Sequence, residues 1–177
     1  MYREIEFEQV TGNKLKSVIC YLWDVNKDYK TMNETYEGSS VLFDILFDKA
    51  YIQECIGYAV FFDEEHSDLR GVVVADDYGS HICALVIRDD TKDMNLHRPL
   101  IYQVVTCNDS YEFTVYVKDE KAYLFEEVGF KRRPNTSDID DKICLFANKD
   151  FEYDWNKGID KNDLIDEEKL LEEKIDN

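Results

Sequence analysis

The sequence predicts a mixed α/β fold, in which strands and amphipathic helices alternate within one domain. Residues 3–10 alternate the apolar Ile5 and Phe7 with glutamates, which is the pattern of a strand with one wet face. Apolar residues then recur at helical spacing from Leu15 to Val25, which predicts a first helix. At 177 residues, of which 44% are hydrophobic, the chain is long enough to bury a core of its own. The strand, the helix and the length together predict a single globular domain.

The middle of the chain predicts a loop, a second helix and three consecutive strands. Residues 26–40 are polar and contain Gly38, so we expect a loop there. A long loop in a compact domain is either functional or a disordered connector, and the residues leave both interpretations open. Apolar residues from Leu42 to Ile52 predict the second helix. The strands are expected at residues 56–62, 69–75 and 81–87, and the last two are apolar throughout, which predicts burial on both faces.

The last third of the chain predicts a strand and helix in close succession, followed by one more strand. A loop is expected at residues 89–100, a helix around residues 100–106, a strand from residue 113 and a final strand at residues 142–147. The strand from residue 113 is rich in β-branched and aromatic residues. The complete order is β-α-α-β-β-β-α-β-α-β.

The helix after residue 118 carries a clear set of boundary signals. Asp119 is expected to be its N-cap, because a short acidic side chain accepts hydrogen bonds from the first helical N–H groups. Gly129 is expected to close it in a left-handed conformation, and Phe130 to return to the core. The apolar residues of this helix are Ala122, Leu124, Phe125 and Val128.

We expect one domain over residues 1–148 and an acidic C-terminal extension over residues 149–177. Leu164, Leu171 and Ile175 fall on one side of a helical pattern whose other side carries many carboxylates, so the extension is predicted to be partly helical. It would pack on the domain or on a partner, or remain a solvated tail.

The net charge of −18 restricts the partners that the chain can bind. It argues against nucleic acid and anionic membranes, and it favours a cationic amine or a lysine-bearing protein. No apolar run approaches the roughly 20 residues of a membrane span, and the N-terminal residues lack signal-peptide character. The five cysteines are scattered and show no paired metal-ligand spacing. We therefore expect a cytoplasmic protein with reduced core cysteines and no metal site.

The stretch from residue 113 to residue 130 resembles the C-terminal signature of the GCN5-related N-acetyltransferases (GNAT). In that pattern a strand is followed by Asn, two residues, Ala, two residues, a Leu-Tyr pair, a short run and Gly-Phe. The matching positions in this chain are Asp119, Ala122, Leu124-Phe125 and Gly129-Phe130. The resemblance implies a mixed, mostly antiparallel central sheet flanked by helices. It also implies acetyl-CoA as cofactor and direct acyl transfer to an amine of a small molecule or protein.

The resemblance also implies where the cofactor would lie. The family's phosphate turn, between the fourth strand and the next helix, corresponds to residues 89–100, which contain no glycine. Its local cations would be the ligands of the pyrophosphate. At the two functional positions of the signature, Asp and Phe stand where the family has Asn and Tyr. The cofactor-binding residues implied in this way are Leu85, Val86, Ile87, Lys92, His97, Arg98, Asp119 and Phe125.

Three side chains are the candidates for acid–base chemistry. His81 is the candidate base, because the ordinary pKa of a histidine suits proton transfer near neutrality. Tyr116 and Tyr123 are the candidate proton donors to the leaving thiolate, since Phe125 has no hydroxyl. A surface histidine and two packing tyrosines are the alternatives. Cys83 and Cys107 are expected to be buried and inert, along with the other thiols.

Three functions stay open on the residues alone. The first is an acetyl-CoA-dependent N-acetyltransferase. The second is a non-catalytic GNAT-fold binding or interaction protein that has lost coenzyme A binding, which the missing glycines and Phe125 favour. The third is an acidic mimic of nucleic acid, for which the net charge is the support. A homodimer is compatible with each of them.

Overall fold

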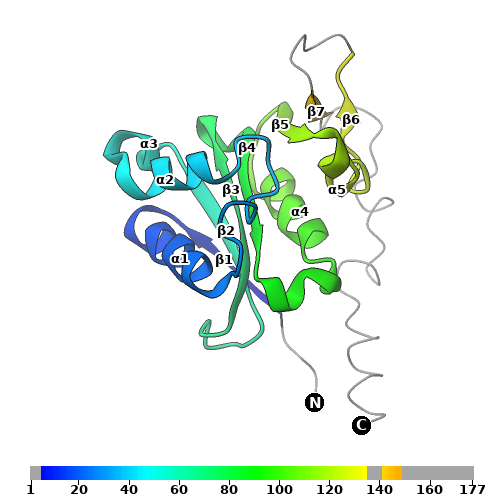
Figure 1. Cartoon of the computed structure of the whole chain (residues 1–177). Helices are drawn as coiled ribbons and strands as arrows, with labels where there is room; N and C mark the ends of the chain where they lie inside the picture. The colour runs from blue at the N-terminus through cyan, green and yellow to red at the C-terminus, as the bar shows by residue number, and fades with distance from the viewer. Residues whose placement is uncertain (1–4, 135–140, 149–177) are drawn as a thin grey trace, which may run out of the picture.

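Seven strands in the described part of the chain form a single sheet with the order β1-β2-β3-β4-β5-β7-β6 (Figure 1). A computed structural model describes residues 5–134 and 141–148. Neighbouring strands are antiparallel, except that β4 and β5 are parallel. The mixed, mostly antiparallel sheet expected from the sequence is therefore confirmed. The strands are β1 (Glu6–Val10), β2 (Ile56–Phe61), β3 (Leu69–Asp76), β4 (His81–Ile87), β5 (Glu112–Lys118), β6 (Lys131–Arg132) and β7 (Lys142–Asn148).

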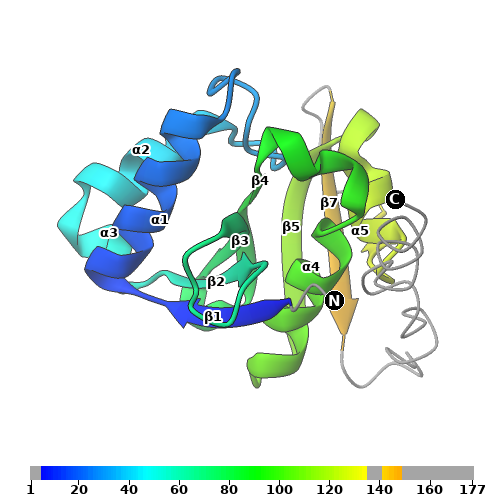
Figure 2. The same ribbon diagram turned by 90° about the horizontal axis from the view of Figure 1, so that it is seen from below.

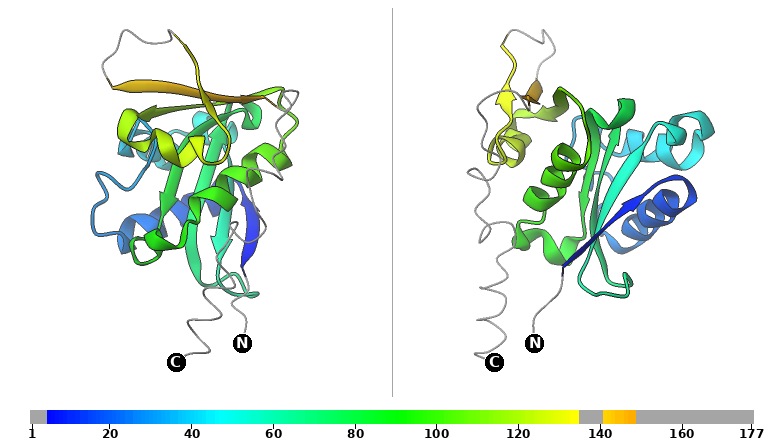
Figure 3. Two further views of the ribbon diagram at one scale, coloured as in Figure 1. Left: turned by 90° about the vertical axis from the view of Figure 1, so that its right-hand side faces the viewer. Right: turned by 180° about the vertical axis from the view of Figure 1, so that it is seen from behind.

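Helices cover both faces of the sheet, which gives the molecule three layers (Figure 3). One face packs against α1, α2 and α3 through apolar residues that include Val72, Val74 and Val86. The other face packs against α4 and α5 through apolar residues that include Val73 and Leu85. The helices are α1 (Gly12–Val25), α2 (Ser39–Phe47), α3 (Lys49–Gln53), α4 (His97–Cys107) and α5 (Ala122–Glu126), with 3₁₀ turns η1 (Asp77–Gly79), η2 (Asp89–Met94) and η3 (Asp119–Lys121).

The element order follows the sequence prediction, with differences at the boundaries. The predicted second helix is two helices, because Asp48 is extended and its side chain accepts hydrogen bonds from the N–H groups of Ala50 and Tyr51, which starts α3. The predicted loop at residues 89–100 is partly wrong, since it contains η2 and the first turn of α4. The two-residue strand β6 was not predicted, because so short a segment carries no periodicity.

The predicted cap of the signature helix is wrong. The N-cap position is Lys118 for η3 and Lys121 for α5, so Asp119 is the first residue inside the 3₁₀ turn. Its carboxylate pairs with Arg132 at 2.9 Å. The other end of that helix is confirmed, since Gly129 has a φ of 115° and Phe130 is buried. The predicted burial of β3 and β4 on both faces is also confirmed.

The cysteine prediction is correct at three positions and wrong at two. Cys55, Cys83 and Cys144 are buried, whereas Cys20 and Cys107 are exposed on the outer sides of their helices. Within residues 5–134 and 141–148, no group of three or more potential metal ligands gathers. No helix in this part of the chain combines the length and the apolarity that crossing a membrane requires. The predicted C-terminal extension lies outside the described residues, so the boundary at residue 148 stays a prediction.

Candidate functional site

The candidate site is the gap that opens between β4 and β5. The two strands pair only at His81 with Thr114 and at Ile82 with Val115, and then diverge. All four residues lie in one sheet, and the helix α5 follows β5 directly after the turn η3. This strand-turn-helix arrangement is the one that the signature predicted for an acyl-pantetheine cleft.

A bulge in β4 decides which main-chain groups face the gap. Val74 pairs with Ala84 but Ala75 pairs with Ile82, so Cys83 is an extra residue in β4. Beyond the bulge, Arg88 donates its N–H to a carbonyl of β3, which places the even-numbered residues on that side. The residues whose main-chain groups point toward β5 are therefore Cys83, Leu85 and Ile87.

A segment of the chain's own loop fills the gap. Residues 33–36, between α1 and α2, run beside the diverging end of β4 and reach β5 (Figure 2). Glu34 donates its main-chain N–H to the carbonyl of Leu85 at 3.0 Å, and Tyr36 donates its N–H to the carbonyl of Tyr116 at 2.8 Å. Asn33 forms an antiparallel bridge with Val86. The segment thus pairs with both diverging strands, as an additional strand would.

Buried side chains of this loop complete the closure. Asn33 Oδ1 accepts the N–H of Leu85 at 3.0 Å, and its amide donates to the carbonyl of Cys83 at 3.3 Å. Thr35 Oγ1 donates to the same carbonyl at 2.8 Å. Asn26 donates to the carbonyl of Ile87 at 3.2 Å. These three polar residues are all buried, and each is satisfied by the edge of β4 that faces the gap.

The cations expected to hold a pyrophosphate are paired with carboxylates. Lys92 lies 3.2 Å from Asp89, and Arg98 lies 3.1 Å from Glu127. His97 is buried and lies 3.3 Å from the same Glu127 oxygen. Burial lowers the pKa of His97 below its usual value, against the opposing effect of Glu127, which favours the neutral ring. A neutral histidine and two neutralised cations offer little attraction to phosphate.

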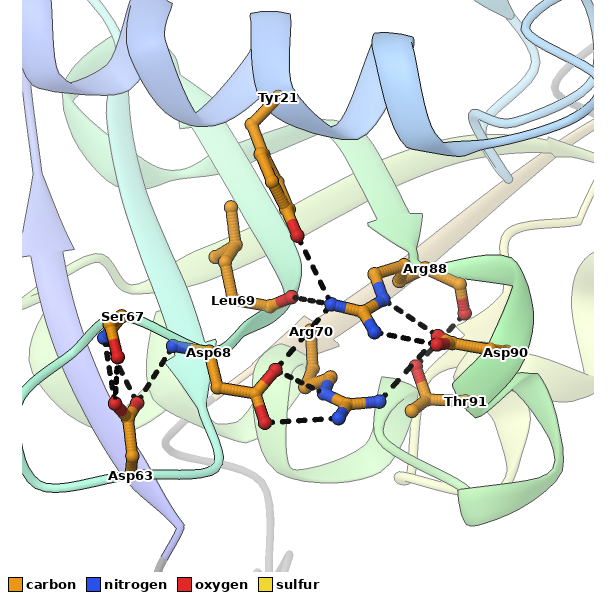
Figure 4. A network of polar contacts seen from close by, with 9 residues as sticks. All are labelled: Tyr21, Asp63, Ser67, Asp68, Leu69, Arg70, Arg88, Asp90 and Thr91. Carbon is orange, nitrogen blue, oxygen red and sulfur yellow. Dashed lines mark hydrogen bonds and ion pairs between the residues drawn. The ribbon is translucent and has the colours of Figure 1, made fainter.

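Residues at the start of β3 and just beyond the end of β4 form a closed charge network (Figure 4). Arg88 donates from two nitrogens to Asp90 at 2.7 and 2.6 Å, and Arg70 donates from two nitrogens to Asp68 at 2.8 and 3.0 Å. Each arginine also lies within 3.6 Å of the other's carboxylate. The hydrogen bond from Arg88 holds the pKa of Asp90 below its usual value. This end of β4 is therefore fixed by bidentate pairs and presents balanced charge.

The acid–base candidates do not converge on one point. His81 Nδ1 lies 2.8 Å from Thr114 Oγ1, and its ring centroid lies 5.1 Å from that of Tyr116, at the paired end of the strands. Lys142 Nζ lies 4.2 Å from the centroid of the Tyr116 ring. Tyr123 is an exposed residue of α5. The structure brings His81 and Tyr116 together and leaves Tyr123 apart, so the catalytic role of each stays a prediction.

The two signature positions with changed residues differ in their exposure. Phe125 is fully buried, with its ring 5.7 Å from Phe130 in an edge-on contact, whereas Asp119 is exposed. Lys121, from the turn between them, lies 2.7 Å from a carboxylate oxygen of Glu34 in the inserted loop. Burial disfavours the charged lysine, but Glu34 outweighs this effect and raises the pKa of Lys121. Phe125 therefore acts in packing, and the turn beside it holds the loop.

The residues of the gap do not fit a bound acyl-CoA. A pantetheine arm would need the main-chain groups of β4, and those of Leu85 are already bonded to Asn33 and Glu34. A pyrophosphate would need cations near the start of α4, and Lys92 of η2 and His97 and Arg98 of α4 are each paired with a carboxylate. The opening beside the loop is a pocket of about 120 Å³ that Lys30, Lys118 and Lys121 help to line. That volume is below the about 300 to 1,000 Å³ typical of ligand sites.

The sequence prediction missed the three residues that close the gap. Asn26, Asn33 and Thr35 lie in the loop that the sequence left open as functional or disordered. Asn33 and Leu85 are 52 positions apart, so no local pattern connects them. Asparagines in a polar run are typical of any loop, so their presence did not indicate a role in the sheet.

Comparison with known proteins identifies the architecture. The structure matches the GNAT domain of S. lividans PAT with a TM-score of 0.59 at 11% identity, over 81% of this chain and 90% of that domain. It matches the spermidine N-acetyltransferase from Vibrio cholerae, solved with CoA and spermine, with a TM-score of 0.57 at 14% identity, over 81% and 95%. An N-acetyltransferase from Staphylococcus aureus Mu50 gives 0.55 at 14% identity, over 82% and 97%. No protein-family model and no curated protein matches the sequence. The fold of this chain is therefore the fold of the GCN5-related N-acetyltransferases.

Proposed function

We propose that this chain is a non-catalytic binding domain with the GNAT fold, whose acyl-CoA cleft is closed by its own residues 33–36. The observation that carries the proposal is the pairing of Leu85, through both its N–H and its carbonyl, with Asn33 and Glu34. A cofactor that pairs with β4 must first displace this segment. Phe125 in place of a proton donor and the paired cations near α4 support the same conclusion.

The cost of displacement explains why the closure would prevent binding. Each main-chain or side-chain hydrogen bond of the segment contributes about 1 kcal/mol net, and a buried group left without a partner costs about 1 to 3 kcal/mol. If opening the gap costs about 4 kcal/mol, the apparent affinity for acetyl-CoA falls by about a thousandfold. A cofactor of micromolar intrinsic affinity would then require millimolar concentrations.

An acetyl-CoA-dependent N-acetyltransferase is the second candidate, and the divergence of β4 and β5 favours it. In this case residues 33–36 leave the gap before the cofactor enters. The acceptor would be a cationic amine or a lysine-bearing protein, in keeping with the net charge of −18 and with the spermine in the complex of the Vibrio cholerae enzyme. The two candidates differ in whether the native chain binds acetyl-CoA.

Thermal unfolding with acetyl-CoA tests the proposal. We expect a shift of the midpoint of at most about 1 °C for the wild-type chain at 1 mM acetyl-CoA. At this concentration a ligand with a Kd of about 10 μM would add about 2.7 kcal/mol. An increase of several degrees in the wild-type chain would reject the proposal and support the enzyme. In that case Asn33→Ala, which loosens the segment, should bind more tightly than wild type, whereas the exposed control Asn13→Ala should not.

A further inference from the structure

Four aromatic rings form a continuous surface feature on the layer that contains α1 and α2. Trp23 of α1 stacks on Tyr29 at 5.0 Å between ring centroids and meets Phe43 of α2 edge-on at 4.9 Å. Phe43 in turn stacks on Phe47 at 6.0 Å. We call these four residues the aromatic ladder. Phe47 is 75% exposed, Phe43 47% and Tyr29 44%, so most of the ladder faces solvent.

The aromatic ladder borders a pocket large enough to receive a side chain. The pocket has a volume of about 280 Å³ and is lined by Cys20, Trp23, Asp24, Phe43, Leu46 and Phe47. Single exposed apolar residues are ordinary on protein surfaces, whereas a contiguous apolar patch rimmed by polar residues marks a binding surface. Aromatic residues are also enriched in protein interfaces, and tryptophan and tyrosine are among the residues that most often carry the binding energy.

The charges around the ladder select the chemistry of a partner. Asp24 is the charged residue in the lining of the pocket, beside Trp23 and Phe43. A second copy of a chain of net charge −18 would bring further negative charge toward Asp24. Lysine or arginine would be attracted both by the carboxylate of Asp24 and by the faces of the aromatic rings.

We propose that the aromatic ladder binds a segment of a partner protein in which an apolar or aromatic side chain is flanked by lysine or arginine. The apolar side chain occupies the pocket beside Phe47, and the basic residues lie against the ring faces and Asp24. This inference goes beyond the proposed function and does not depend on it. Binding of acetyl-CoA by the wild-type chain would reject the closed cleft and leave the aromatic ladder as it is.

Selection from a random-peptide display library on the full chain tests the proposal. We expect enriched peptides that combine an aromatic or large apolar residue with neighbouring lysine or arginine. Fluorescence anisotropy of the best peptide then measures the affinity for three variants. Phe47→Ser and the double variant Phe43→Ser with Phe47→Ser should each weaken binding by about tenfold or more, and Asp24→Asn by about threefold.

The control is Tyr111→Ser, which removes an aromatic ring that is 64% exposed and does not belong to the ladder. It should leave the peptide affinity unchanged. The proposal is overturned if no peptide is enriched, if the enriched peptides lack basic residues, or if the Phe43 and Phe47 substitutions leave binding unchanged while circular dichroism reports a folded chain. Sedimentation that reveals a dimer which Phe47→Ser dissociates would also overturn it, because a second copy would then be the occupant.

Discussion

The main-chain hydrogen-bonding groups of β4 and β5 are satisfied in different ways at the two ends of the pair. At the paired end, Ile82 and Val115 lie side by side and the strands satisfy each other directly. At the diverging end, the main-chain groups of Leu85 and Tyr116 point into a gap and are satisfied by residues 33–36. Divergence of two strands therefore does not by itself create a ligand site. The loop sequence decides whether the gap is left for a ligand or filled by the chain.

Removal of the Asn33 side chain, which bonds the loop to the diverging end of β4, should reduce stability more than any other change considered. Asn33→Ala should lower the free energy of unfolding by about 3 kcal/mol, because the N–H of Leu85 is left buried without a partner and the amide bonds to Cys83 and Gly38 are lost. Urea denaturation measures the change. The exposed Asn13→Ala should stay within about 0.5 kcal/mol of wild type. Equal stability of the two variants would mean that the loop does not fill the gap.

A hydroxyl group placed at Phe125 tests whether the space beside the gap is dry. Phe125→Tyr should lower the free energy of unfolding by about 2 kcal/mol, since the added oxygen would enter a fully buried site. Guanidinium denaturation measures it. The control is Phe43→Tyr on the exposed surface, where the hydroxyl reaches water. A neutral effect at position 125 would reveal a polar cleft that reaches this ring.

The charge network at the end of β4 should contribute less, because its carboxylates are partly exposed. Asp90→Asn should cost about 1 kcal/mol at low salt, through loss of the bidentate pair with Arg88 and the contact with Arg70. The cost should shrink in about 1 M salt. Asp93→Asn, an exposed neighbour, should have no measurable effect in the same denaturation experiment. A salt-independent cost at position 90 would contradict this account.

The smallest effect concerns pH and the start of α4. His97 has a lowered pKa when folded, so between its folded pKa and its ordinary value of 6.5 the unfolded chain binds more protons. The stabilisation that comes from the neutral His97 should therefore be fully present above about pH 6.5. It should decrease as the pH falls toward and through the folded pKa. His97→Gln should flatten the dependence of the free energy of unfolding on pH in this window, relative to the wild-type chain. An unchanged slope would mean that His97 is not buried in its neutral form.

The sheet could be predicted from the sequence because its signals are local. Period-2 alternation and the apolar runs of β3 and β4 each depend on a few neighbouring residues. The glycine that ends the signature helix, Gly129 with its positive φ, is a local signal of the same kind. The site could be predicted only as a position between β4 and the signature helix. Its closure depends on the bulge at Cys83 and on an asparagine 52 residues away from its partner, and neither leaves a local pattern.

The inserted loop also affects how this protein behaves among other chains. An unpaired strand edge is a template on which a neighbouring polypeptide can add a strand, and such edges are common starting points for aggregation. Because residues 33–36 occupy the inner edge of β4, this sheet offers no such template between β4 and β5 in the described part of the chain. A change that releases this loop would therefore make the protein prone to aggregation and would also open its cleft.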